Sequence, residues 1–164
     1  MKVSTALRSR TRGFTLIELL VVMGILGVLA AAVMPLGEAL VTSQKERELR
    51  RALWEIRDAV DAYKRHVDQG LIDARLTESG YPASLRTLVE GVPDARAASG
   101  GQRWYFLRQV PRDPFADANL SPEQTWRLRS YASPPDRPAP GADVYDVRSS
   151  STGTALDGSA YANW

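Results

Sequence analysis

The most prominent hydrophobic pattern in this 164-residue chain is an apolar run near its start, from Thr15 to Leu36. A helix needs about 20 such residues to cross the hydrocarbon core of a bilayer, so the run is long enough to span a membrane. Its one charged residue is Glu18, and a carboxylate inside a membrane costs about 2.5–3.5 kcal/mol on insertion scales. Because the run contains no cation, Glu18 needs a partner from elsewhere and is a candidate functional residue.

Beyond this run the pattern becomes that of an amphipathic helix. From Glu38 to about Gln69, apolar residues recur every three or four positions, which places them on one side of a helix. They are Leu49, Ala52, Leu53, Ile56, Val60, Tyr63 and Val67. Gly70 is a suitable stop. We therefore expect one helix from Phe14 to Gln69, about 80 Å long at 1.5 Å per residue.

Most other positions in the second half of this helix are charged. They include Lys45, Glu46, Arg47, Glu48, Arg50, Arg51, Glu55, Arg57 and Asp58. The simplest interpretation is a solvated face with local ion pairs, each worth a few tenths of a kcal/mol. The alternative is that these charges set the lateral register between neighbouring copies of the chain.

Pro35 lies where the two halves of the helix meet. Its ring removes one backbone donor, so the helix should bend or loosen there. Gly24 and Gly27 also weaken the helix propensity of the apolar half. In a membrane, the same small residues would let helices pack closely, and a plain anchor helix is an equally good interpretation.

The remaining residues predict a small α+β head. Ala83 to Glu90 reads as a short helix closed by Gly91, with an exposed loop after it. Trp126 to Ala132 and Val144 to Arg148 alternate well enough for two strands. We therefore expect a long N-terminal helix packed on a small antiparallel β-sheet.

Two further segments of the head are expected to be structural. The aromatic residues of 104–107 should cover the long helix, and Asp113-Pro114 should turn the chain. His66 is the only histidine, and it lies on the long helix without a neighbouring acid–nucleophile pair, so a surface or boundary position is expected. No catalytic constellation is recognisable, and we expect no enzyme.

The segment before the apolar run is basic and carries no acid, which is typical of a short leader that stays in the cytoplasm. Its bases are Lys2, Arg8, Arg10 and Arg12. Cleavage between Gly13 and Phe14 would create an α-amine that can pair with Glu18. An ordinary secretory signal, cut at the small residues 30–32, is the alternative. Glu18 argues against it, because such a signal has no use for a charge in its apolar segment.

Charge and cysteine content refine the picture. The whole chain has a formal charge of +2, from 21 basic and 19 acidic residues. Since the leader holds four of the bases, the remainder has 17 bases against 19 acids, a net charge of −2. The high pI is therefore poor support for nucleic-acid binding. The chain has no cysteine, so packing, a metal ion or neighbouring molecules must stabilise the head.

Residues 13–22, Gly-Phe-Thr-Leu-Ile-Glu-Leu-Leu-Val-Val, closely resemble the processing motif of the type IV pilin-like family. The resemblance implies that a prepilin peptidase cuts after Gly13 and methylates Phe14. It also implies that Glu18 pairs with the terminal amine of a neighbouring subunit, and Pro35 matches the position of a proline in the family. The chain would then comprise a cleaved leader (1–13), a transmembrane assembly helix (14–36), an amphipathic half-helix (37–70) and a head (71–164).

Motifs in the head resemble the major pseudopilins of type II secretion. They are Tyr81-Pro82, the Val-Pro-x-Asp-Pro-Phe sequence of residues 110–115, Tyr145-Asp146-Val147 and Trp164. The resemblance implies a periplasmic pseudopilus that polymerises from the bacterial inner membrane and drives export of folded proteins. Implied partners are further copies, other pseudopilins, prepilin peptidase, an inner-membrane assembly platform and membrane lipid; no nucleic acid is expected.

Other functions remain open at this stage. A type IV pilin or minor pilin for adhesion, motility or DNA uptake would share everything before Pro35. A DNA-binding role would need an exposed basic patch on the head. A singly anchored periplasmic enzyme would need a catalytic cleft, and the sequence indicates none.

The final loop departs from the family resemblance. Many major pseudopilins bind calcium there with several acids, whereas residues 149–158 contain only Asp157. Calcium takes six to eight oxygen ligands. Asp157 with Ser149, and with Asp146 if the strand end faces them, would make a weak calcium site. The favoured interpretation is that Asp157-Gly158 forms a turn.

Overall fold

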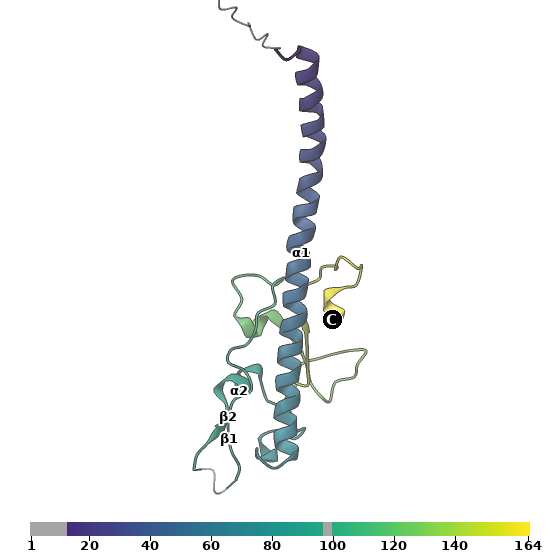
Figure 1. Ribbon diagram of the computed structural model, residues 1–164. Coiled ribbons are helices and arrows are strands. Elements are labelled where there is room, and N and C mark those ends of the chain that lie inside the picture. Colours follow the sequence, from purple (N-terminus) through teal and green to yellow (C-terminus); the bar gives the residue numbers. More distant parts are fainter. Residues whose placement is uncertain (1–12, 97–99) are drawn as a thin grey trace, which may run out of the picture. The chain divides into compact units, whose positions relative to one another are not determined.

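The computed structural model describes residues 13–96 and 100–164. The expected leader therefore lies outside the described residues, except for Gly13. The chain divides into two units, of which the first ends at Leu40 and the second comprises Val41–Trp164. Figure 1 labels α1, α2, β1 and β2 among the elements and colours the chain by residue number. The helices are α1 (Leu16–Asp68), α2 (Leu85–Glu90) and the 3-10 turns η1 (Ala74–Leu76), η3 (Pro122–Thr125) and η4 (Tyr161–Asn163). The strands are β1 (Val92–Pro93), β2 (Arg103–Trp104), β3 (Trp126–Arg129) and β4 (Asp146–Ser149).

Helix α1 confirms the predicted helix to within two residues at each end. At its C-terminus the Gly70 N–H donates to the Val67 carbonyl, and the Leu71 N–H donates to the His66 carbonyl. Gly70 has φ +70°, the left-handed conformation in which glycine closes a helix with this pair of bonds. The predicted stop at Gly70 is therefore confirmed.

The second unit has a core built on one side of α1. All seven predicted apolar positions of this helix are buried, together with Ala59. They pack against apolar residues of α2, β3, β4 and the C-terminal segment, among them Leu88, Trp126, Val147 and Tyr161. The prediction that one side of the amphipathic half forms the core is confirmed.

The strands described in the head form two separate two-stranded antiparallel sheets. β1 pairs with β2, with Val92 opposite Trp104, and β3 pairs with β4, with Leu128 opposite Val147. The α+β prediction is confirmed, but β1 and β2 occupy segments that were expected to be a loop and an aromatic cluster. A strand of two residues is too short to show the alternation of apolar and polar positions from which strands are predicted.

The predicted strand 126–132 is too long, because β3 ends at Arg129. After this residue the Ser130 N–H donates to the Ala139 carbonyl, and the Tyr131 N–H donates to the Asp143 carboxylate. Both acceptors lie in the loop between β3 and β4, so residues 130 and 131 do not pair with β4. β4 likewise begins two residues later than predicted, since the Val144 N–H donates to the Pro82 carbonyl.

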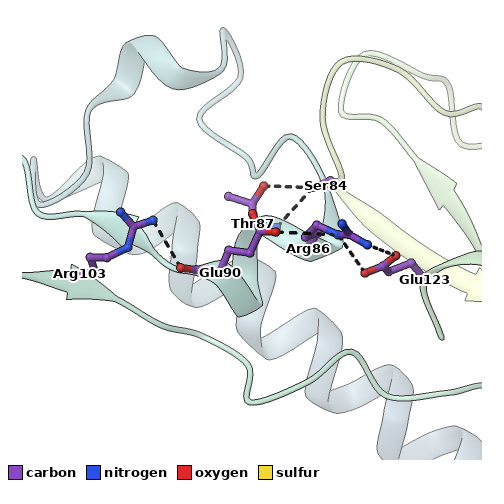
Figure 2. A network of polar contacts seen from close by, with 6 residues as sticks. All are labelled: Ser84, Arg86, Thr87, Glu90, Arg103 and Glu123. Carbon is purple, nitrogen blue, oxygen red and sulfur yellow. Dashed lines mark hydrogen bonds and ion pairs between the residues drawn. The ribbon is translucent and has the colours of Figure 1, made fainter. Parts of the chain in front are cut away.

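Helix α2 is capped at both ends; its predicted stop at Gly91 is confirmed, but it begins at Leu85, two residues later than predicted. The Ser84 hydroxyl accepts the Thr87 N–H at 3.3 Å, and Gly91 closes the helix with φ +75°. Figure 2 shows this cap together with two arginine contacts. Arg86 of α2 reaches the Glu123 carboxylate of η3 at 3.3 Å, and Arg103 of β2 donates to the Glu90 carbonyl at 3.4 Å.

The aromatic segment covers α1, which confirms its predicted structural role. The Trp104 and Phe106 rings stand edge-on to His66, with centroids 4.9 and 5.0 Å away, and Phe106 also contacts Tyr63 at 5.5 Å. His66 is half-buried, the boundary position that was expected for it.

Candidate functional site

Thr15, the residue immediately before α1, caps the N-terminus of this helix. Its hydroxyl accepts the Glu18 N–H at 3.3 Å, and its carbonyl accepts the Leu19 N–H at 3.1 Å. A threonine three residues before a glutamate has the spacing of a helix-capping box, which satisfies donors that the first turn leaves free. Gly13 and Phe14 therefore stand outside the helix, exposed. Exposed, non-helical backbone is where proteolytic cleavage concentrates.

The structure brings three of the predicted site residues together. Gly13, Phe14 and Glu18 line one open hollow of about 380 Å³ with Thr15. The Glu18 side chain is exposed, and it has no ion-pair partner among the described residues. As an acid in the first turn it is favoured by the positive end of the helix dipole. The carboxylate is thus available to a cation that approaches the start of the helix.

The apolar side chains after Glu18 have no cover within their own unit. Leu19 is 59% exposed, Met23 64% and Val28 73%, and the 18-residue apolar stretch is wholly unburied. An apolar surface of this length needs lipid or other protein to cover it. By length and composition, α1 is the one helix in the described part of the chain that can cross a membrane.

Pro35 lies apart from this group. Helix α1 continues through position 35 without interruption. Pro35 is therefore not a helix end, and its expected role in loosening the helix stays a prediction.

The two residues considered for calcium make separate hydrogen bonds. Ser149 is fully buried, and its hydroxyl donates to Asp113 at 2.5 Å. Asp157 lies in an exposed turn, where one oxygen accepts both the backbone N–H and the hydroxyl of Ser159. This turn is closed by the Gly158 N–H, which donates to the Ala155 carbonyl at 2.9 Å. The described residues contain no group of three or more His, Cys, Asp or Glu side chains that could hold a metal ion, and the calcium site stays a prediction.

The structure reveals a second group of polar residues, which bind the C-terminal segment to α1. Glu46 is buried, and its Oε1 accepts the Leu156 N–H at 2.8 Å and the Tyr161 hydroxyl at 3.1 Å. Burial raises the pKa of Tyr161 to about 12, and the hydrogen bond to Glu46 acts in the same direction. Arg50 approaches the Trp164 ring at 4.3 Å.

Arg57 completes this attachment. It donates to Asp146 at 2.8 Å, to the Val147 carbonyl at 2.9 Å and to the Trp164 carbonyl at 3.0 Å. The expectation that the charges of this half-helix are only a solvated face is therefore wrong for Glu46 and Arg57. Their partners lie about 90 to 115 positions away in the sequence, beyond the reach of helical spacing.

Comparison with known proteins adds to this geometry. Residues 8–34 match the family model described as the prokaryotic N-terminal methylation motif. The chain is 32% identical to the type II secretion system core protein G of Pectobacterium carotovorum subsp. carotovorum over 133 residues, covering 77% of this chain and 78% of the relative. It is 31% identical to the protein of the same name from Klebsiella pneumoniae, covering 77% and 86%.

A related protein of another kind is also similar. The type IV major fimbrial protein FimA of Dichelobacter nodosus is 31% identical over 119 residues, covering 66% of this chain and 64% of the relative. No solved structure gives a significant match.

Proposed function

The chain belongs to the pilin-like family of type II secretion system core protein G, and we propose that it polymerises into a periplasmic pseudopilus that drives export of folded proteins. Its role as a pseudopilin is structural, as the names of its relatives indicate. The observation that best supports the proposal concerns the Glu18 carboxylate. It has no ion-pair partner among the described residues, and it lies beside the Gly13–Phe14 junction at the N-terminus of α1. The apolar side chains that follow it are not covered by other residues of their own unit.

The chain is a single-pass, membrane-anchored protein. The basic leader would keep the start of the chain on the cytoplasmic side of the bacterial inner membrane, with the head in the periplasm. The apolar side chains of α1 would face lipid before assembly and the helices of other copies afterwards. The small residues Gly24 and Gly27 would let those helices approach closely.

Processing would supply the missing partner of Glu18. Prepilin peptidase would hydrolyse the Gly13–Phe14 peptide bond with water and transfer a methyl group from a methyl-donor cosubstrate to the new amine of Phe14, which stays cationic after a single methylation. Because Thr15 caps the helix immediately after this residue, the new amine would lie at the helix start, close to the level of Glu18. A carboxylate of one copy and an amine of the next, both removed from water, attract strongly and make subunit addition specific.

Substitution of Glu18 tests this role in polymerisation. Glu18→Ala, in the full chain with the peptidase and the assembly platform present, should be inserted and cleaved normally but should form no pseudopili. The matched control is Glu38→Ala, which removes an exposed acid from the same helix. Filaments counted by electron microscopy and secretion of a reporter protein give the readout. Pseudopili at the normal level from Glu18→Ala would refute the role of the carboxylate.

The similarity to the fimbrial protein FimA favours a second candidate, a type IV pilin. The phenotype of a strain that lacks the chain distinguishes the two functions. Deletion of a pseudopilin stops protein secretion, whereas deletion of a pilin removes long surface filaments and leaves secretion intact.

A further inference from the structure

A cleft of about 830 Å³ opens in the head beside the loop that joins β3 to β4. It is lined mainly by residues 75–79, which follow α1, and by residues 130–133 and 140–143 of that loop. All of these residues belong to the second unit of the chain. Ligand pockets in proteins commonly measure about 300–1,000 Å³, so the cleft is large enough for a ligand. Which ligand it suits depends on the polar groups that line it.

Asp143 is the buried acid of this cleft. It is 7% exposed, and its Oδ1 accepts the Tyr131 N–H at 2.8 Å. Its Oδ2 accepts no hydrogen bond, and the carboxylate has no ion pair with any described residue. The other two buried aspartates of the described chain differ, since Asp94 pairs with Arg96 and Asp113 accepts hydrogen bonds through both oxygens. A buried carboxylate is costly without a compensating charge, so the cleft suits a cation.

Ser130 is a second buried group with spare hydrogen-bonding capacity. It is 5% exposed and lines the same cleft, and its hydroxyl has no hydrogen-bond partner in the described part of the chain. Its backbone is fixed, because the Ser130 N–H donates to the Ala139 carbonyl at 3.0 Å. Buried polar side chains nearly always have a partner. The free hydroxyl and the free carboxylate oxygen of Asp143 therefore indicate a ligand with at least two donors.

Tyr131 gives the cleft an aromatic surface. The residue is 60% exposed, yet its ring stacks on Tyr81 with centroids 5.5 Å apart and meets Tyr145 edge-on at 5.6 Å. A side chain that neighbours already hold in place loses little conformational freedom when a ligand packs against it. Cations bind over the faces of aromatic rings, and arginine does so most often because its guanidinium is planar.

The charged residues around the cleft leave Asp143 without a cation. Two acids, Glu78 and Asp143, line the cleft together with one base, Arg75. The Arg75 side chain is 93% exposed, and its ion pair, at 3.8 Å, is with Asp73, which does not line the cleft. The cation that this site lacks must therefore come from another molecule.

We propose that this cleft binds an arginine side chain presented by an exposed segment of a partner protein. The guanidinium donates to Asp143 Oδ2 and to the Ser130 hydroxyl, and it lies against Tyr131. A guanidinium carries five N–H donors in a flat fork and stacks on rings, whereas the compact ammonium of lysine presents no flat face. The inference goes beyond the proposed function, because the cleft lies within one copy of the chain and needs no polymer.

Titration of the full chain in detergent micelles with short capped peptides tests the ligand. The probe is acetyl-Gly-Arg-Gly-amide, whose only charge is the guanidinium, and the comparison peptides carry lysine or glutamine in place of arginine. Amide chemical shifts in NMR spectra report binding, and the Tyr131 amide is the most direct reporter because it donates to Asp143. We expect the arginine peptide to shift this signal saturably, the lysine peptide to bind several-fold more weakly, and the glutamine peptide to leave it unchanged.

Asp143→Asn removes the charge but keeps the structural hydrogen bond, because the amide oxygen still accepts the Tyr131 N–H. It should weaken binding of the arginine peptide about tenfold or more, as loss of a charge-assisted hydrogen bond does. The matched control is Asp117→Asn, which changes an exposed aspartate that also accepts a backbone N–H and lies outside the cleft; it should bind as the natural chain does. Ser130→Ala should weaken binding several-fold at unchanged Tm, because the hydroxyl has no partner among the described residues.

The outcomes separate this site from the proposed function. If Asp143→Asn binds the arginine peptide as tightly as the natural chain, or the glutamine peptide binds equally well, the site is wrong and the pseudopilin function stands. If the lysine peptide binds as tightly as the arginine peptide, the assignment to a guanidinium is wrong. If Arg75→Ala strongly raises the affinity, the chain's own Arg75 occupies the cleft and no partner is needed. If the natural chain binds the arginine peptide through Asp143 but forms no filaments, the cleft stands and the proposed function is wrong.

Discussion

Removal of the Glu46 carboxylate should loosen the C-terminal segment from α1. In Glu46→Ala, the Leu156 N–H and the Tyr161 hydroxyl lose their common acceptor, at 2.8 and 3.1 Å. Tyr161 is 2% exposed, so its hydroxyl would be left without water. Each buried donor without a partner costs about 1–3 kcal/mol. Since the variant no longer buries a charge, part of this cost is recovered, and we expect a net loss of about 3 kcal/mol.

Thermal unfolding of the full chain in detergent, followed by near-ultraviolet circular dichroism, measures this loss. A change of about 3 kcal/mol should lower Tm by about 10 °C for a domain of this size. The matched control is Glu48→Ala, which removes an exposed acid two positions along the same helix and should shift Tm by no more than about 1–2 °C.

A double-mutant cycle with Tyr161→Phe tests whether the two side chains act together. The combined variant should lose less stability than the sum of the single variants, because both remove the same hydrogen bond. Hydrogen exchange at the Leu156 amide should accelerate in Glu46→Ala but not in Tyr161→Phe. A Tm for Glu46→Ala equal to that of Glu48→Ala would refute the assigned role of Glu46.

Three further predictions concern the head. Since the folded-state pKa of Tyr161 is raised from 10.0 to about 12, its contribution to stability should be complete below pH 10 and lost as pH rises through 12; Tyr161→Phe should lack this loss in alkaline unfolding titrations. Gly91→Ala should lower the free energy of unfolding by about 2 kcal/mol in denaturant titrations, because a Cβ at φ +75° would lie 2.7 Å from the Tyr105 ring. Chelation of calcium should leave Tm unchanged, because Ser149 and Asp157 are engaged with Asp113 and Ser159; a shift of several degrees would contradict this.

The sequence predicts those features that depend on local periodicity. Helix α1, its core side and its stop at Gly70 follow from a repeat of three to four residues and from the conformational freedom of glycine. The start of the apolar run likewise identified Gly13, Phe14 and Glu18 as neighbours, since they lie within about one and a half turns.

The features that the sequence failed to predict depend on distant partners. Glu46 and Arg57 look like ordinary charges of a solvated helix, yet both are fixed by residues from the far end of the chain. The short strands β1 and β2 were missed for a similar reason, because a pair of two residues is stabilised by its surroundings and not by its own pattern. Burial of Glu46 could be inferred only from the fold.

Helix α1 of the second unit carries its core residues and its exposed charges on different sides, with Leu49, Ile56 and Tyr63 inward and Trp54 outward. This separation has an evolutionary consequence. Substitutions on the outward side can accumulate without unfolding the head, so the surface that the chain presents to other molecules can change while the fold stays the same. Inward positions, together with Glu46, lack that freedom, and divergence between related chains should therefore concentrate on the outward side.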